Sequence, residues 1–201
     1  NFAVLSFKLI NMILVTGGTG FVGGHLLDRL VHEKIQTRCL VRKSSNIEKL
    51  KKEKALIDVA FGDLTDDESL KKALEGVETV VHLIGIIVEK KGATFEIIHT
   101  QGTRKLVNAC KMAGVRRFIY ISALGAREKA RSRYHLTKWE AEQAVIQSGM
   151  EYVIFRPSIM IGKGGEFITM LSRIVKEAPV VPVIDGKSKV QPIYVENTID
   201  C

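Results

Sequence analysis

Three side chains in the middle of the chain have the types and spacing of a proton-transfer site. Tyr134 and Lys138 stand four positions apart, so a helix would carry both on one face. A tyrosine has a reference pKa of about 10, and a nearby ammonium lowers that pKa because it favours the phenolate. Ser122 ends an apolar run and can hydrogen-bond a carbonyl or hydroxyl oxygen. These residues predict a general acid/base, Tyr134, with Lys138 as electrostatic partner and Ser122 as orienting donor.

A glycine-rich stretch near the start of the chain could hold a phosphate. It follows the apolar run 12–16 and precedes a helical pattern of leucines. The first N–H groups of a helix and its macrodipole attract phosphate. We expect Gly17 to turn the chain, Gly20 to let a pyrophosphate touch the backbone, and Gly23 to let the helix pack against the strand. A flexible turn is the alternative, but the strand-to-helix context favours dinucleotide binding, in which Lys138 would also contact the ribose.

Alternating strands and helices must position these residues, and the pattern from Met12 onward alternates in that way. The first, fourth and sixth strands are nearly continuous apolar runs, typical of strands buried on both faces. The expected strands are 12–16, 36–41, 57–61, 78–84, 115–121 and 151–155. The expected helices are 21–33, 46–54, 66–75, 94–113 and 134–148. Asp66 is an expected N-cap, and Gly114 and Gly149 are expected helix ends. The class is therefore α/β, a doubly wound parallel sheet or Rossmann fold.

The chain divides into three parts. We expect residues 1–11 to lie outside the fold, 12–156 to form the nucleotide-binding core, and 157–201, which holds all four prolines, to begin a substrate-side region. In that last part we expect a helix at 166–176 and strands at 180–184 and 190–195. The end of the chain reads as a strand leading into a helix, so we expect a fragment with an unfinished substrate side.

Composition restricts the class of partner. The net charge is +8, but lysine and glutamate are interspersed, which indicates solvated helix faces rather than a nucleic-acid patch. Such a surface would still attract an anionic cofactor. Neither a transmembrane helix nor a signal peptide is expected. Cys39, Cys110 and Cys201 form no C-x-x-C pair and lack histidine at metal spacing. We therefore expect no metal site, buried thiols at Cys39 and Cys110, and a reducing, cytoplasmic compartment.

The end of the second strand bears on which nicotinamide cofactor would bind. An acidic residue there hydrogen-bonds the ribose 2′-hydroxyl in NAD binders, whereas a guanidinium can pair with a 2′-phosphate. Here Arg42 follows Val41, and no acid is present. The sequence therefore favours NADP(H) over NAD(H). A solvated basic loop is the alternative, and it applies more to Lys43 than to Arg42.

The glycine stretch also carries a family resemblance. Residues 16–23, T-G-G-T-G-F-V-G, resemble the T-G-x-x-G-F-x-G fingerprint of extended and atypical short-chain dehydrogenases/reductases. The serine, tyrosine and lysine described above resemble the triad of that superfamily. The resemblance covers roughly residues 12–196 and implies that Thr19, Phe21 and Val22 also lie at the cofactor.

The same resemblance assigns roles at three strand ends. It implies that Asp63 and Leu64 contact the adenine ring, and that Gly85 lets the backbone approach the cofactor. It places Pro157 and Ser158 near the nicotinamide and substrate. For Asp63, a turn or capping role is the alternative.

Three residues leave alternatives open. His82, within an apolar strand, fits a hydrogen-bonded core histidine better than a ligand. His99 stands where relatives carry an asparagine that helps build a water relay to the active lysine, and both a structural and a functional role fit it. Arg156 suits either the substrate side or a structural ion pair.

Residues 134–142, 156–158 and 179–182 carry a narrower resemblance, to the nucleotide-binding accessory subunit of respiratory complex I and its bacterial relatives. Two hypotheses follow. One is an NAD(P)(H)-dependent oxidoreductase, or nucleotide-sugar epimerase or dehydratase, whose small-molecule substrate is a nucleotide sugar or a quinone-like molecule. The other is a non-catalytic NADP(H)-binding subunit of a larger assembly. A homodimer is a further candidate state.

Overall fold

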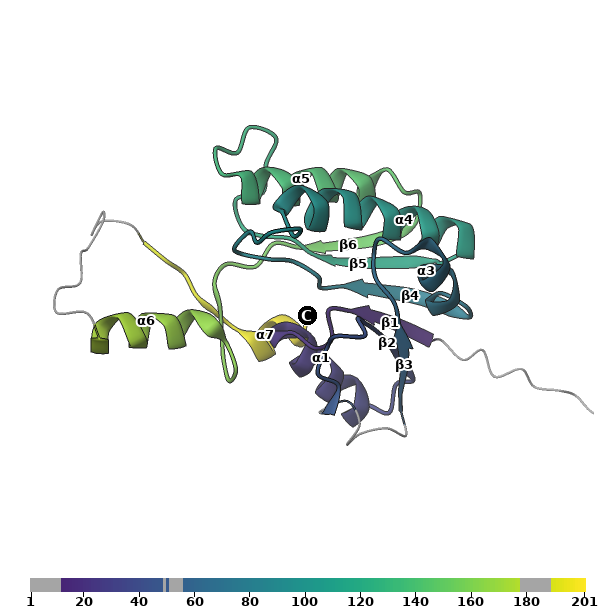
Figure 1. Cartoon of the computed structure of the whole chain (residues 1–201), viewed down its shortest axis with the longest axis horizontal. Helices are drawn as coiled ribbons and strands as arrows, with labels where there is room; N and C mark the ends of the chain where they lie inside the picture. The colour runs from purple at the N-terminus through teal and green to yellow at the C-terminus, as the bar shows by residue number, and fades with distance from the viewer. Residues whose placement is uncertain (1–11, 49, 51–55, 178–188) are drawn as a thin grey trace, which may run out of the picture.

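A parallel sheet of six strands forms the centre of the protein. The computed structural model describes residues 12–48, 50, 56–177 and 189–201 (Figure 1). The strands are β1 (Met12–Thr16), β2 (Thr37–Val41), β3 (Ile57–Phe61), β4 (Val77–His82), β5 (Arg117–Ile121) and β6 (Glu151–Phe155). Their order in the sheet is β3-β2-β1-β4-β5-β6, and each pairs in parallel with its neighbours. This is the expected Rossmann fold.

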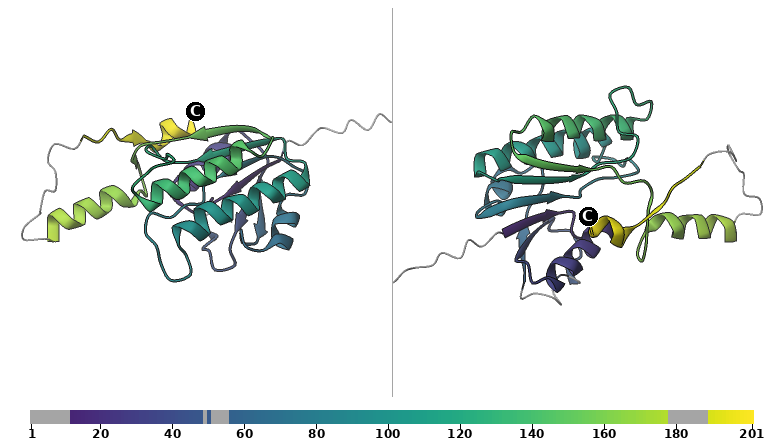
Figure 2. Two further views of the ribbon diagram at one scale, coloured as in Figure 1. Left: turned by 90° about the horizontal axis from the view of Figure 1, so that it is seen from above. Right: turned by 180° about the vertical axis from the view of Figure 1, so that it is seen from behind.

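Helices cover both faces of the sheet. The helices that cover it are α1 (Phe21–His32), α3 (Asp67–Ala73), α4 (Gly102–Ala113) and α5 (Arg133–Ile146). Figures 1 and 2 show α3, α4 and α5 on one face and α1 on the other. Leu14 and Val80 pack toward α3, α4 and α5, whereas their neighbours Val15 and Val81 pack toward α1. Successive residues of a strand point to opposite faces, so β1 and β4 are apolar almost throughout.

Most expected elements are confirmed with small shifts at their ends. The strands at 12–16, 57–61 and 151–155 match in full. The Asp66 side chain accepts a hydrogen bond from Ser69 N at the start of α3, and Gly114 ends α4 with a left-handed φ of 72°. The expected helix at 94–113 instead begins as a π-helix, η1 (Glu96–Gln101), before α4.

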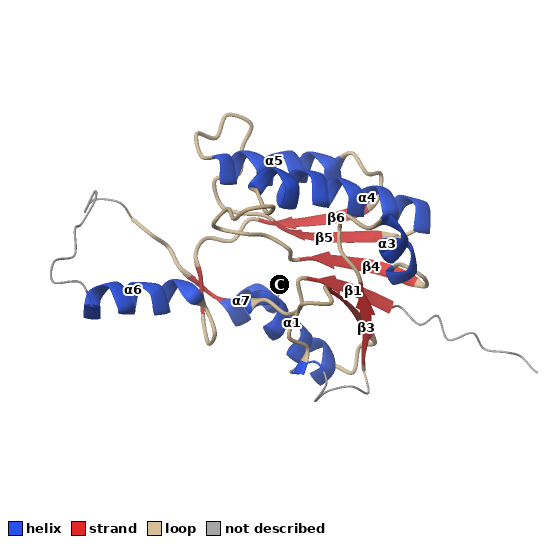
Figure 3. Ribbon diagram, viewed as in Figure 1, coloured by secondary structure: helices blue, strands red, loops and turns tan. Residues whose placement is uncertain are grey.

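The segment after β6 forms a small second sheet and two helices. β7 (Met160–Ile161) pairs in parallel with β8 (Ile193–Tyr194), while α6 (Glu166–Glu177) and α7 (Val195–Ile199) complete the segment (Figure 3). The strand expected at 190–195 is shorter because α7 begins at Val195. The extension 1–11, most of the helix expected at 46–54, and the strand expected at 180–184 lie outside the described residues.

Candidate functional site

The loop between β1 and α1 has the geometry of a phosphate-binding turn. Gly17 has a φ of +80°, which side chains rarely allow, and Gly20 N donates to Gly17 O at 3.0 Å. Gly20 is the N-cap of α1, with no side-chain cap and no acidic residue in the first turn. Thr19 and Gly20 are exposed. The helix therefore presents its first N–H groups and its positive end to solvent, where a pyrophosphate fits.

Gly23, the third glycine of the motif, allows a close contact of α1, but with a different partner from the expected strand. A Cβ on Gly23 would overlap the Gly17 carbonyl and lie 2.6 Å from Gly18 Cα. Gly23 therefore lets α1 approach the turn itself, rather than the strand. Sequence reasoning did not single out Gly18, whose Cβ would overlap Cys39 Sγ and lie 2.7 Å from Leu27 Cδ1. The doubled glycine was the only signal for that residue.

Phe21 and Val22, expected at the cofactor, lie in the first turn of α1 and are half-buried. The Phe21 ring packs edge-on against the His25 ring, with 5.5 Å between their centroids. A Cβ on Gly165 would lie 3.2 Å from the Phe21 ring. The contact of Phe21 is thus with the loop after β7, and its contact with a cofactor stays a prediction.

His25 joins α1 to that loop and to α7. Its Nδ1 lies 2.5 Å from Glu196 Oε1, and its Nε2 lies 2.9 Å from Lys163 O. Both partners accept hydrogen bonds, so the arrangement suits the doubly protonated ring. The hydrogen bond to the Lys163 carbonyl has the largest effect in raising the pKa of His25, and the Glu196 carboxylate raises it further. Figure 1 shows α7 beside α1.

We expect this contact to stabilise the protein at low pH. A raised pKa in the folded state gives a contribution that is complete below the unfolded value of about 6.5 and is lost as the pH rises through the folded pKa. The difference in unfolding free energy between the wild type and His25→Gln, measured by urea denaturation, should therefore shrink from pH 6 to pH 9. A difference that stays constant over this range would contradict the charged pairing. Asp28, whose charge also raises the pKa, is unchanged in this comparison.

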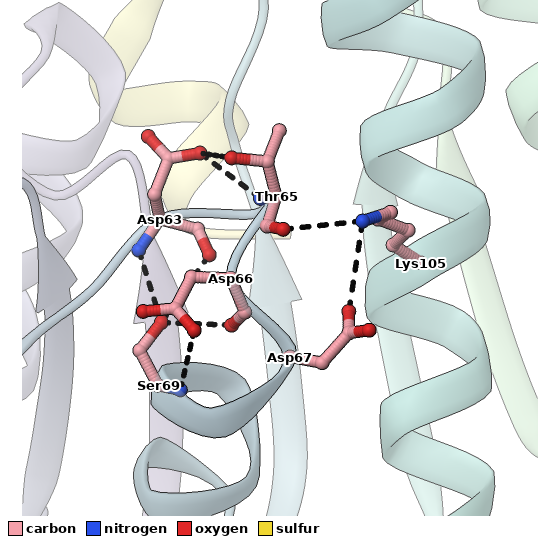
Figure 4. Close-up of polar contacts among 6 residues, drawn as sticks. All are labelled: Asp63, Thr65, Asp66, Asp67, Ser69 and Lys105. Carbon is pink, nitrogen blue, oxygen red and sulfur yellow. Dashed lines mark hydrogen bonds and ion pairs between the residues drawn. The ribbon is translucent and has the colours of Figure 1, made fainter.

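The ends of β2 and β3 carry the residues expected at the adenosine. Arg42 directly follows β2 and is exposed, as is Lys43. Asp63 Oδ1 accepts hydrogen bonds from Thr65 N at 2.9 Å and from Thr65 Oγ1 at 2.8 Å (Figure 4). The turn role of Asp63 is therefore confirmed. Leu64 is buried, and a Cβ on Gly102 would lie 3.0 Å from its Cδ1. Contacts of Asp63 and Leu64 with adenine stay predictions.

The loop after β4 brings Gly85 to side chains from two other elements. A Cβ on Gly85 would lie 3.6 Å from His99 Nε2 and 3.7 Å from Lys138 Nζ. Gly85 is itself exposed. A ligand resting on this backbone would therefore lie close to both side chains.

Ser122 and Lys138 lie together at the carboxyl end of β5. Lys138 Nζ donates to Ile121 O at 2.6 Å, one residue before Ser122. Ser122 N donates to Phe155 O at 2.7 Å, which fixes its backbone. The Ser122 hydroxyl is buried and has no hydrogen-bond partner among the described residues. A buried hydroxyl without a partner is costly, so it is suited to a ligand oxygen.

The environment of Tyr134 differs from the expected one. Burial raises the pKa of Tyr134, whereas we expected the ammonium to lower it. The Lys138 ammonium instead bonds to Ile121 O and lies 4.4 Å from the centroid of the Tyr120 ring. Lys138 is only 3% exposed, and burial lowers its pKa to about 7. The reason is desolvation, which spacing on a helix does not reveal.

His82 and Arg156 have structural contacts. His82 is fully buried, with Nδ1 2.6 Å from Thr16 Oγ1 and Nε2 3.0 Å from Thr103 Oγ1. Burial lowers its pKa to about 3, so the expected core histidine is confirmed. Arg156 forms two bonds to the buried Glu142 carboxylate, at 2.9 and 2.5 Å, and is therefore an ion-pair partner.

Pro157 and Ser158 follow Arg156 and are half-buried. Pro157 O accepts a hydrogen bond from Leu124 N at 2.9 Å, which ties this segment to the loop after β5. The position of both residues near a nicotinamide stays a prediction.

Cys39 and Cys110 are buried, and burial raises the pKa of Cys39 to about 11. The described residues contain no group of three or more potential metal ligands. No helix in the described part of the chain is long and apolar enough to cross a membrane.

Comparison with known proteins agrees with this geometry. A model of the NAD(P)H-binding family matches residues 17–175. The chain is 31% identical to the ceramide reductase of Caulobacter vibrioides over 192 residues, which cover 92% of this chain and 58% of that protein. It is 32% identical to the mitochondrial NADH dehydrogenase [ubiquinone] 1 alpha subcomplex subunit 9 of Arabidopsis thaliana over 186 residues. These residues cover 90% of this chain and 46% of that protein.

Solved structures support the fold. The Bordetella bronchiseptica enzyme WbmH in complex with NAD+ matches with a TM-score of 0.81 at 18% identity, covering 94% of this chain and 70% of that one. The chain spans about half the length of the two curated relatives, 58% and 46%. The glycine turn, the parallel sheet and the family match lead to one conclusion: the chain belongs to the NAD(P)H-binding family and has the fold of the short-chain dehydrogenases/reductases.

Proposed function

We propose that this chain is the nucleotide-binding part of an NAD(P)(H)-dependent oxidoreductase or epimerase whose reacting groups are Ser122, Tyr134 and Lys138. One observation carries the proposal: the buried Ser122 hydroxyl has no partner among the described residues, and Ser122 directly follows Ile121, whose carbonyl holds the Lys138 ammonium. Most buried side-chain hydroxyls in proteins are hydrogen-bonded, so an unpartnered hydroxyl at this strand end favours a ligand oxygen there.

The three side chains have separable roles in this mechanism. A bound nicotinamide supplies hydride chemistry. The Ser122 hydroxyl orients the substrate oxygen. The Tyr134 hydroxyl exchanges a proton with that oxygen, and its raised pKa keeps it protonated at neutral pH, which suits proton donation to a carbonyl. The buried Lys138 ammonium would contact the ribose of a bound nucleotide and would favour the phenolate once the proton has left.

Further residues would complete the site. Backbone groups at Gly17, Thr19, Gly20, Phe21, Val22 and Gly23 would hold the pyrophosphate. Asp63 and Leu64 would border the adenine, while Gly85, Pro157 and Ser158 would border the nicotinamide. Residues 157–201 would lie on the substrate side. Nucleotide sugars and quinone-like molecules are the candidate substrates, and the name of the ceramide reductase relative adds a long-chain lipid.

A second function competes with this one. The Arabidopsis relative is named as a subunit of NADH dehydrogenase. In addition, the Lys138 ammonium is held by Ile121 O. Both observations suit a subunit that binds NADP(H) without turning it over, within a larger assembly.

Transfer of label separates the two functions. Nicotinamide labelled at C4 would be incubated with the protein and a panel of nucleotide sugars, hydroxy-thioesters, quinones and long-chain keto-lipids. Label transfer to or from any member supports the enzyme. Tight nucleotide binding without transfer across the whole panel supports the cofactor-binding subunit.

We further propose that Arg42 selects NADP(H) over NAD(H). A guanidinium pairs with a 2′-phosphate through two parallel hydrogen bonds, and Arg42 stands exposed at the end of β2. A hydrogen bond to a charged group contributes about 1.5–3 kcal/mol.

Arg42→Ala should therefore weaken NADP(H) binding by about ten- to a hundredfold and leave NAD(H) binding nearly unchanged. Isothermal calorimetry with both cofactors measures this. Lys43→Ala, at the next exposed position, is the matched control and should have a smaller effect. Equal affinity of the wild type for NAD(H) and NADP(H) would refute the selectivity.

A further inference from the structure

His99 connects the loop after β4 to α5. It is fully buried in the π-helix η1, and both of its ring nitrogens have hydrogen-bond partners. Nε2 lies 3.1 Å from Ile86 N, beside Gly85. Nδ1 lies 3.0 Å from Thr137 Oγ1 on α5. One imidazole thus connects the backbone proposed to face the cofactor to the helix that carries Tyr134.

The chemistry of the partners gives these bonds a direction. The Ile86 N–H can only donate, so His99 Nε2 must accept and carries no proton. The proton of the neutral ring is then on Nδ1 and is donated to Thr137 Oγ1. The Thr137 hydroxyl in turn donates to Arg133 O at 2.9 Å or Tyr134 O at 3.1 Å. Each donor in this series of hydrogen bonds has an acceptor, and the donors all point from the loop toward the first turn of α5.

A second proton on His99 would disrupt this series of hydrogen bonds. It would place an Nε2–H against the Ile86 N–H, so two donors would face each other. The titratable groups around the ring are Lys138 and Tyr134 on α5 and His82 on β4, none of which is an anion at neutral pH. Burial, with the Lys138 charge, lowers the pKa of His99 to about 3.

The His99 ring also packs against the Tyr134 ring. The centroids of the His99 and Tyr134 rings are 5.4 Å apart, in an edge-on arrangement. Phe95 stacks on His99 at 5.5 Å and meets Tyr134 edge-on at 5.7 Å. Rotation of the His99 ring would therefore disturb both hydrogen bonds and the packing of Tyr134.

We propose that His99 is a positioning residue, held neutral with its proton on Nδ1, which fixes the first turn of α5 and Tyr134 against the Gly85–Ile86 backbone and does not conduct a proton. The proposal rests on the proposed function where it concerns turnover. The tautomer and the link to nucleotide binding stand independently of turnover.

The tautomer is tested on the wild-type protein. Long-range ¹H–¹⁵N correlation of labelled histidine side chains would be recorded between about pH 5.5 and 8, with and without NADP(H). His99 should keep a protonated Nδ1 and an unprotonated Nε2 throughout this range. Titration of His99 in this range, or a protonated Nε2, would overturn the proposal. Because this experiment needs no substrate, it stays decisive even where no turnover is found.

Two variants separate the two hydrogen bonds. Asparagine can keep the donor to Thr137 but loses the acceptor for Ile86, and glutamine can keep that acceptor but loses the donor. His99→Asn should weaken NADP(H) binding by about three- to tenfold, as expected for one lost hydrogen bond. His99→Gln should lower kcat by about three- to tenfold with nearly unchanged nucleotide affinity. Both effects should be the same at pH 6 and pH 8.

If His99 conducted a proton, the two variants would change kcat and nucleotide affinity in a different way. Both variants would then lower kcat by about a hundredfold or more with unchanged nucleotide affinity, and one limb of the pH–rate profile would disappear. That result would overturn the positioning role. Thr137→Val, which removes the acceptor while keeping the shape of the side chain, should reproduce the effect of His99→Gln. Wild-type turnover by Thr137→Val would also contradict the proposal.

Discussion

Tyr134→Phe should lower turnover by about 10²–10⁴-fold, the contribution that general acid–base catalysis typically makes. Phenylalanine keeps the ring, so the edge-on contacts of Tyr134 with Phe95 and His99, at 5.7 and 5.4 Å, are preserved. The fold and the nucleotide affinity should therefore be nearly unchanged. Nicotinamide absorbance measures turnover on whichever substrate accepts label, and calorimetry measures the nucleotide affinity.

The chain offers a matched control for this change. Tyr152 lies on β6 and is 45% exposed, so Tyr152→Phe removes the same hydroxyl outside the site and should leave turnover unchanged. Lys138→Met should weaken nucleotide binding in addition, because its ammonium would contact the ribose. Label transfer at the full rate by Tyr134→Phe would remove Tyr134 from the mechanism.

Gly23→Ala should weaken binding of NAD(P)(H) by about five- to a hundredfold. The new Cβ would overlap the Gly17 carbonyl and lie 2.6 Å from Gly18 Cα, so the turn must shift away from α1. Forcing one extra carbon into a close-packed contact costs about 1–3 kcal/mol, and here that cost falls on the loop that would hold the pyrophosphate. Calorimetry measures the affinity, and thermal unfolding reports on the fold.

Gly24→Ala is the control, one position further along the same helix. A Cβ on Gly24 would meet no atom within 4 Å. Alanine also reduces the conformational freedom of the unfolded chain, so Gly24→Ala should raise the unfolding free energy by about 0.4–1 kcal/mol and leave nucleotide affinity unchanged. Equal affinities of the two variants would show that the contact around Gly23 does not shape the nucleotide site.

Much of the fold follows from local patterns in the sequence. The apolar run of β1, the Asp66 cap and the left-handed Gly114 depend on residues close to one another in the chain. Strand–helix alternation then restricts the sheet to a parallel one. The π-helical start of η1 was missed because π-helical turns are rare and occur mostly as single turns within α-helices.

The sequence predicted which residues form the candidate site but not their contacts or pKa values. The spacing of Tyr134 and Lys138 and the glycine motif indicate which side chains to inspect. The expected lowering of the Tyr134 pKa was wrong, because a side chain's charge and solvation depend on residues far away in the chain. Lys138 is buried and bonded to Ile121 O, a contact that no local pattern contains.

The sequence alone determined the class of fold, the glycine turn and the identity of the residues that could react, since these depend on period, conformational freedom and side-chain chemistry. Only the tertiary structure decided that the Ser122 hydroxyl has no partner among the described residues, and which groups His99, Arg156 and His25 contact. The physical reason is that hydrogen bonding and desolvation are set by groups brought together from distant parts of the chain. Three contacts of this kind join η1 to α5, the residue after β6 to α5, and α1 to α7.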